Sequence, residues 1–185
     1  IGVGAAIGGN GAGFSNTGFP IAAVGYEALK AHPGALGNTA LGYRALSLEA
    51  NSSSTKNTIV GYLAAYNQNG GTGSTTALGY QSLLSVTTGN ANTSVGASAL
   101  ESVTTASNST AIGFGALGAN TASSGTAIGY RALAANITGS FNTALGYNSG
   151  AAQAGASDDS NTWVGYQAGK VANGSSSARN TVVGA

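Results

Sequence analysis

Close copies of one segment recur along the whole chain, and the clearest copy is Asn38-Thr39-Ala40-Leu41-Gly42-Tyr43-Arg44-Ala45-Leu46. Two of them read Asn142-Thr143-Ala144-Leu145-Gly146-Tyr147 and Asn161-Thr162-Trp163-Val164-Gly165-Tyr166. Each copy contains one glycine after an apolar residue, which we call the anchor glycine. Successive anchors lie 16 to 23 residues apart, at Gly2, Gly25, Gly42, Gly61, Gly79, Gly96, Gly113, Gly129, Gly146, Gly165 and Gly184. A motif repeated at such a near-constant period predicts a solenoid, a chain built from one repeated supersecondary unit.

The composition argues against several other classes of protein. The chain has 31 glycines in 185 residues, but they do not fall at every third position, which excludes collagen. Only 6% of the residues are charged, the net charge is +1 and the basic residues are scattered, so we expect no nucleic-acid partner. There is no cysteine to form a disulfide or a thiolate metal site. No run of about 18 apolar residues occurs, so we expect no membrane insertion in this segment.

The alternation of residues around each anchor predicts a β-strand. With the anchor as position 0, position −3 is usually Thr, −1 is Val, Leu or Ile, +1 is Tyr and +2 is mostly polar. Side chains of a strand alternate between its two faces, so −1, +1 and +3 should be buried and +2 should face water. A helix is the alternative for the stretches that contain Ala and Leu, but the repeated segments are short and are interrupted by Gly, Ser, Thr and Asn. We assign structural roles to the anchors from Gly25 to Gly165 and to the −1 residues Leu41, Leu78, Val95, Ile112, Ile128, Leu145 and Val164.

The stretches between the repeated segments are rich in Ser, Thr, Asn and Gly, as expected of turns. We therefore predict that residues 1–185 form a single all-β domain, a parallel β-solenoid of about ten coils of 16–19 residues. Each coil should hold two short strands and two turns, stacked at ~4.8 Å per coil. Gly89, in a variable turn, should tolerate a larger residue better than Gly96. Each coil buries few large side chains, whereas ordering the backbone costs ~1–2 kcal/mol per residue. The folded state of a single chain should therefore be only marginally stable, and we expect copies of the chain to associate.

The repeats resemble those of a known group of proteins. Asn92-Thr93-Ser94-Val95-Gly96-Ala97 and Ser109-Thr110-Ala111-Ile112-Gly113-Phe114 are similar to the head repeats of trimeric autotransporter adhesins and to related repeats of bacteriophage tail fibres. The resemblance covers essentially the whole chain. It implies a left-handed parallel β-roll, a homotrimer, and an extracellular location on a cell surface or virion. The adhesin repeats are usually shorter, and they carry a branched apolar residue where this chain has Thr39 or Thr143.

Motifs that suggest catalysis have simpler explanations, so we expect neither an enzyme nor a bound cofactor or metal. The Gly2-Val3-Gly4-Ala5-Ala6-Ile7-Gly8 stretch mimics a dinucleotide-binding loop, but its spacing is wrong. Ser53-Ser54-Thr55-Lys56 matches Ser-x-x-Lys inside a serine-rich turn. His32 is the only histidine, and the adjacent acids Asp158 and Asp159 suit a solvated loop.

The repeat pattern leads to a structural function. We expect a segment of a longer fibre protein, a stalk or head of an adhesin or tail fibre that positions a receptor-binding tip. The alternative is a surface-binding solenoid that contacts host glycan or matrix, for which the tyrosine column at +1 is the candidate site. Such a column more often belongs to a core or a subunit interface. Ice binding through the threonine column at −3 is a further alternative, although threonine shares its side of the strand with the −1 residues that we expect to be buried.

Overall fold

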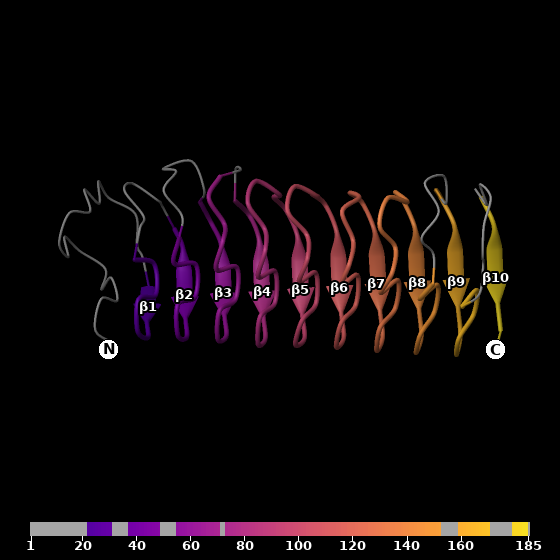
Figure 1. Ribbon diagram of the computed structural model, residues 1–185, viewed down its shortest axis with the longest axis horizontal. Coiled ribbons are helices and arrows are strands. Elements are labelled where there is room, and N and C mark those ends of the chain that lie inside the picture. Colours follow the sequence, from indigo (N-terminus) through magenta and orange to yellow (C-terminus); the bar gives the residue numbers. More distant parts are fainter. Residues whose placement is uncertain are drawn as a thin grey trace.

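The computed structural model describes residues 22–30, 37–48, 55–70, 73–152, 159–170 and 179–184. These residues form one parallel sheet in which the strands follow one another in chain order. The strands lie side by side along a rod, with β1 at one end of the sheet and β10 at the other (Figure 1). The strands are β1 Ala22–Val24, β2 Thr39–Leu41, β3 Thr58–Val60, β4 Thr76–Leu78, β5 Thr93–Val95, β6 Thr110–Ile112, β7 Thr126–Ile128, β8 Thr143–Leu145, β9 Thr162–Val164 and β10 Thr181–Val183. The predicted all-β parallel solenoid is confirmed, while its left-handed sense stays a prediction.

Some predicted features lie outside the described residues. They are the glycine stretch from Gly2 to Gly8, His32, the serines of the Ser-x-x-Lys match, and Asp158.

Equivalent positions of successive copies lie in register across the sheet. Thr93 of β5 pairs with Thr110 of β6, and Val95 pairs with Ile112. Each strand covers only positions −3 to −1 and ends at the anchor glycine that follows it. The repeat period therefore sets the register, because one coil brings each residue above its own counterpart.

The anchor glycines are required by both conformation and space. Gly96 has a φ of +130°, and a Cβ atom built on it would lie 2.6 Å from the carbonyl oxygen of Gly113 in the next coil. The other anchors from Gly25 to Gly165 repeat this arrangement, so the backbones of successive coils approach closely at this column. The expectation for Gly89 is wrong, because a Cβ there would overlap the carbonyl oxygen of Ala106. The turn that contains Gly89 is as tightly stacked as the strands.

Each described coil contains one strand, and the second strand that we predicted is replaced by a bent segment. Residues at +2 and +4 adopt left-handed backbone conformations, as at Arg131 and Leu133, both with a φ of 51°. The amide of Arg131 donates to the carbonyl of Phe114 in the preceding coil, at 2.9 Å. The amide of Leu133 donates to the carbonyl of Ser149 in the following coil, also at 2.9 Å. The bent segment thus bonds to both neighbouring coils without forming a regular strand, and we call it the second wall.

The core is a thin layer between the sheet and the second wall. It is made of positions −2, +3 and +4, as in Ala127, Ala132 and Leu133, which are completely buried. The hydroxyl oxygens of Ser82 and Ser94 lie 2.7 Å apart across this layer, so the two walls are in direct contact. The prediction that −1 and +1 are buried is wrong, whereas burial of +3 is confirmed. The alternation fails at the anchor because its positive φ redirects the chain, and the strand does not continue beyond −1.

An asparagine ladder runs inside the roll at position −4. Asn38, Asn57, Asn92, Asn142 and Asn161 are buried there. Their side-chain Oδ1 atoms each accept a hydrogen bond from the backbone amide of the −4 residue in the next coil, at 2.8 to 2.9 Å. The ladder therefore supplies partners for amides that enter the strands, and buried amides without partners are costly.

Candidate functional site

The most unusual surface of the rod is the outer side of its sheet, which we call the sheet face and define as the −3 and −1 side chains of β1 to β10. Because −2 points into the core, −3 and −1 point outward. Leu41, Leu78 and Leu145 keep 46%, 48% and 47% of their surface exposed. The −1 residues that we assigned to the core lie in one outward column. Leu41, Leu78, Ile112, Ile128 and Leu145 are exposed, and Val95 and Val164 are partly buried. The alternation of residue types does not indicate which side of the strand faces outward.

The threonines at −3 form a second outward column on the sheet face. Nine of the ten strands begin with Thr, and these residues pair with one another in register along the sheet. They are exposed or half-exposed, so our expectation that they are buried with the −1 residues is wrong. The prediction that the −3 and −1 side chains share one side of the strand is confirmed, but that side is the outer one.

The aromatic residues at +1 form two stacked ladders at the end of the sheet face. Ring centroids of neighbouring coils lie 5.0 to 5.5 Å apart with interplanar angles of 6° to 12°. The rings are exposed, so placement in the core is wrong. The first ladder contains Tyr26, Tyr43, Tyr62 and Tyr80, and the second contains Phe114, Tyr130, Tyr147 and Tyr166. Ala97 occupies the position between them.

This stacking limits what the aromatic column can bind. A sugar ring usually packs on the face of an aromatic ring, but inside each ladder both faces are covered by neighbouring rings. Uncovered faces remain at the ladder ends, including those of Tyr80 and Phe114 that are directed toward Ala97. The predicted glycan stripe along the whole column is therefore not favoured by the geometry.

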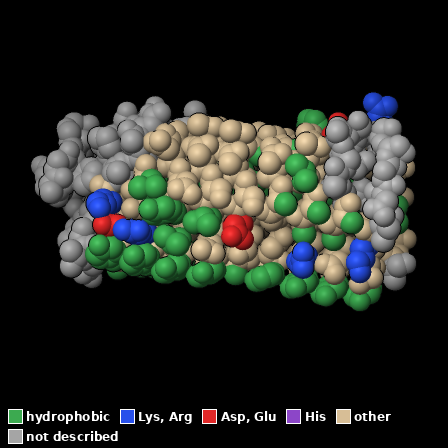
Figure 2. Space-filling view, in the orientation of Figure 1, with side chains coloured by type: hydrophobic (Ala, Val, Ile, Leu, Met, Phe, Trp, Pro, Cys, Tyr) green, Lys and Arg blue, Asp and Glu red, His purple; other side chains and the backbone are tan. Residues whose placement is uncertain are grey.

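Exposed hydrophobic side chains are concentrated in these columns. Within the described ranges, 19 large hydrophobic residues are exposed, and 15 of them belong to the −1 and +1 columns. Figure 2 shows hydrophobic side chains in a band along the lower edge of the rod. Contiguous apolar patches larger than a few hundred Å² are rare on monomeric proteins and mark interaction surfaces.

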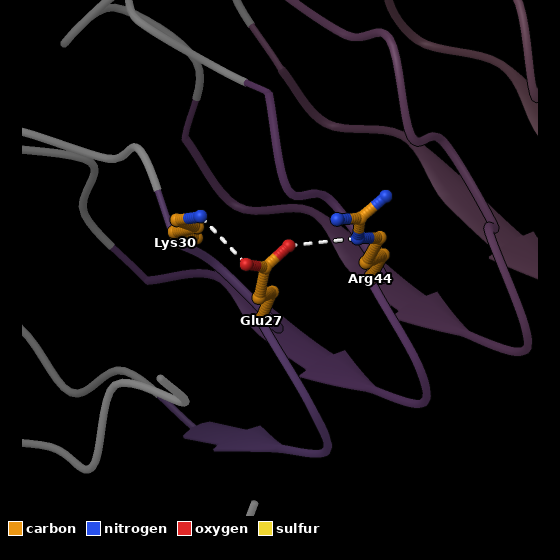
Figure 3. A network of polar contacts seen from close by, with 3 residues as sticks. All are labelled: Glu27, Lys30 and Arg44. Carbon is orange, nitrogen blue, oxygen red and sulfur yellow. Dashed lines mark hydrogen bonds and ion pairs between the residues drawn. The ribbon is translucent and has the colours of Figure 1, made fainter. Parts of the chain in front are cut away.

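A charged network joins the first two coils (Figure 3). Glu27 lies between Lys30 and Arg44, with distances of 2.6 Å from Oε1 to Lys30 Nζ and 2.7 Å from Oε2 to Arg44 Nε. The hydrogen bond from Lys30 is the largest influence on the pKa of Glu27 and lowers it. Burial opposes this shift, while the hydrogen bond from Arg44 and the charges of Arg44 and Lys30 add to it, so the pKa is lowered overall. The bond to Glu27 raises the pKa of both Lys30 and Arg44.

Arg44 also connects this network to the first aromatic ladder. Its guanidinium carbon lies 5.5 Å from the ring centroid of Tyr43 and 6.0 Å from that of Tyr26. These distances suit cation–π attraction. The network therefore stabilises the packing between two neighbouring coils.

Other predicted site residues have structural contacts. Asp159 accepts a hydrogen bond from the backbone amide of Ser140 in the preceding coil, at 2.6 Å, which explains one of the adjacent acids as a turn residue. Among the described residues, no group of three or more His, Cys, Asp or Glu side chains is arranged to hold a metal ion. Within the same ranges, no helix has the length and apolar character needed to cross a membrane.

The surfaces described above are the basis for inferring function. No protein-family model, no curated protein and no solved structure matches this chain.

Proposed function

We propose that this chain is a stiff segment of an extracellular fibre, a stalk or head of an adhesin or tail fibre on a cell surface or virion. Three copies associate through the sheet face, and the rod holds a receptor-binding tip away from the surface that carries it. The observation that carries the proposal is the continuous outward column of aliphatic −1 residues, such as Leu78 and Leu145, on an in-register parallel sheet. An isolated rod leaves this column in water.

The energetics favour association along the whole rod. Full burial of a Leu or Ile side chain contributes ~1.5–3 kcal/mol, so covering the exposed half of one such side chain contributes about 1 kcal/mol per coil. The contribution repeats at each strand, because the −1 residues are in register from β1 to β10. A partner with the same repeat period matches this spacing without distortion, and the simplest such partner is another copy of the chain.

The backbone geometry supports the mechanical part of the proposal. Hydrogen bonds between coils run along the rod in both the sheet and the second wall, as from Gly96 to Leu78 at 2.8 Å and from Ser98 to Tyr80 at 2.9 Å. Pulling the coils apart must break several of these bonds at once in each coil. A fibre segment needs this resistance to bending and extension.

Sedimentation equilibrium of the full chain tests the proposal. We expect a species of three times the 17.7 kDa chain mass. Replacing Leu145→Asp places an unpaired charge in the buried interface and should yield monomers. Asn148→Asp is the matched control, because it introduces the same charge in the same coil at a half-exposed +2 position. A well-folded wild-type chain that remains monomeric at high concentration contradicts the proposal.

The outward threonine column favours a second candidate function, binding to ice. Regularly spaced hydroxyl and aliphatic groups on a flat, rigid face can order surface water, and Thr110 and Ile112 of β6 are repeated in this way on the neighbouring strands. This function needs a free sheet face and hence an unassociated rod. Thermal hysteresis that is abolished by Thr110→Tyr, in a chain that sediments as a monomer, would support ice binding over the fibre proposal.

A further inference from the structure

A hollow interrupts the second wall near the middle of the rod. Its volume is about 330 Å³, at the lower end of the range for small-molecule sites. It forms because the coil that follows β6 has glycine at both outward positions, Gly115 at +2 and Gly118 at +5. Other described coils carry larger side chains at +2, such as Gln81 and Arg131.

Two opposite charges lie at the hollow without partners. Glu101 comes from the coil before the glycines and Arg131 from the coil after them, and both line the hollow. Neither side chain forms a hydrogen bond or an ion pair with another residue that the structure describes. Elsewhere in the described chain, Glu27 is paired with both neighbouring cations. Glu101 and Arg131 therefore remain available to a ligand.

An aromatic surface completes the hollow. Phe114 lines it, and only one face of this ring is covered, by Tyr130 at a centroid distance of 5.5 Å. The opposite face is directed toward Ala97, where the ladder has no ring. Phe114 is 52% exposed, and Ser98 adds a hydroxyl group beside it.

We propose that this hollow binds a single pyranose unit of a glycan. The apolar face of the sugar ring packs against Phe114. The carboxylate of Glu101 accepts hydrogen bonds from neighbouring sugar hydroxyls, and the guanidinium of Arg131 donates to hydroxyl oxygens at the other side of the ring. Hydrogen bonds that involve one charged group are stronger than neutral ones, and the ring stack adds selectivity against open-chain polyols.

The proposed site is independent of association through the sheet face. The hollow lies on the outer side of the second wall, and the core layer of Ala116 and Leu117 separates that wall from the strands. A fibre assembled through its sheet faces leaves the hollow open to solvent. The site would give the rod a weak lectin-like function along its side, in addition to its structural function.

Fluorine NMR of the full chain labelled with 4-fluorophenylalanine tests the site. The chain has four phenylalanines, and the Phe114→Tyr variant identifies the resonance of Phe114 by its loss. Methyl α-glucopyranoside, methyl α-mannopyranoside and methyl β-galactopyranoside are titrated separately, with sorbitol as an open-chain control. We expect at least one pyranoside to shift the Phe114 resonance saturably, and sorbitol to leave it unchanged.

Variants of the hollow decide whether the response comes from this site. Gly115→Gln fills the hollow without changing the backbone, because Gln81 occupies the same column with a φ of 53° against 61° for Gly115. It should weaken binding at least about tenfold, as should Glu101→Gln. Asn148→Gln, in the same column but outside the hollow, should leave affinity unchanged. The proposal is overturned if no pyranoside shifts the resonance, if sorbitol shifts it equally, or if Gly115→Gln binds like the wild type.

Discussion

The backbone amide of Asn57 donates a hydrogen bond of 2.8 Å to the side-chain Oδ1 of Asn38, one coil earlier in the roll. Both residues are buried at −4, immediately before a strand. The same bond joins Asn161 to Asn142 near the other end of the rod. The recurrence of asparagine at −4 therefore has a specific cause, since the side chain is a buried acceptor for the amide stacked on it.

Removing one acceptor from this ladder should destabilise the fold. Asn92 accepts from the amide of Ser109 at 2.9 Å and donates through Nδ2 to the carbonyl of Ala106 at 2.9 Å. Asn92→Ala leaves both partners buried and unsatisfied, so we expect a loss of about 2–4 kcal/mol in the free energy of unfolding, measured in urea. Asn67→Ala, at a half-buried position outside the ladder, is the control and should stay within about 0.5 kcal/mol of the wild type. Equal losses for the two variants would refute a special role of the ladder.

The anchor glycines should tolerate no side chain. Gly96→Ala places a Cβ against the Gly113 carbonyl in a conformation that favours glycine, so we expect a loss of several kcal/mol or failure to fold. Gly115→Ala is the contrasting variant, because its nearest neighbour would be the Cγ of Arg131 at 3.6 Å. It should cost only about 1 kcal/mol for the left-handed backbone. Thermal unfolding of the two variants side by side compares the positions, and similar melting temperatures would contradict this assignment.

The repeat period was sufficient to predict the solenoid, the parallel pairing and one strand beside each anchor. The predicted strands were centred on the anchor glycines, whereas the observed ones end just before them, and the predicted second strand of each coil is replaced by the bent second wall. It was not sufficient to predict which side of each strand is buried. Alternation groups −3 with −1 and separates them from −2, but it does not say which group faces the core. The decisive feature is the bend at the anchor glycine, after which +3 and +4 return to the core beside −2. Ala127 and Leu133 show the result, a small residue opposite a large one in a thin layer.

Two local features were beyond what the sequence pattern indicates. Left-handed backbone at leucines such as Leu100, with a φ of 51°, is uncommon for that residue. It accompanies the bonds of its segment to both neighbouring coils, from Ser98 to Tyr80 and from Leu100 to Ala116. The hollow between Glu101 and Arg131 depends on glycines at two outward positions of one coil. A comparison of the +2 and +5 columns along the sequence would have found that pair of glycines, with Glu101 at +5 of the preceding coil and Arg131 at +2 of the following one, although not that these residues line one hollow.

The +4 residues are buried and the −1 residues are exposed, contrary to our expectation for −1, and this changes the expected cost of substitutions at the two positions. Leu133 is completely buried, so Leu133→Ala should lower the free energy of unfolding by about 2–5 kcal/mol through loss of packing. Leu145 is 47% exposed, so Leu145→Ala should cost less than about 1 kcal/mol in the isolated chain. Urea unfolding at low protein concentration measures the free energy of unfolding of both variants without a contribution from association. A larger loss for Leu145→Ala in a demonstrated monomer would contradict the core described above.

Stability should depend on pH through Glu27. Its pKa is lowered in the folded chain from an ordinary value of 4.5, mainly by the bond from Lys30, so its pairing stabilises the fold above that pH. The stabilisation should be lost as the pH falls below 4.5 and the carboxylate takes up a proton. The difference in melting temperature between wild type and Glu27→Gln should therefore be present at pH 7 and shrink toward pH 3. A difference that grows on acidification would contradict the sign of this shift.

Filling the gap in the aromatic column should stabilise the rod. Ala97 occupies the +1 position between Tyr80 and Phe114, where the aligned backbone leaves space for one ring between two uncovered faces. Ala97→Tyr should join the two ladders into one, and aromatic pairs of this kind contribute about 0.5–1.5 kcal/mol beyond their buried area. We expect the melting temperature to rise by roughly 2–4 °C for each kcal/mol gained. Ala97→Leu adds apolar surface without a ring and should raise it less. If Ala97→Tyr melts below the wild type, the ladder spacing does not extend through this coil and the gap has another cause.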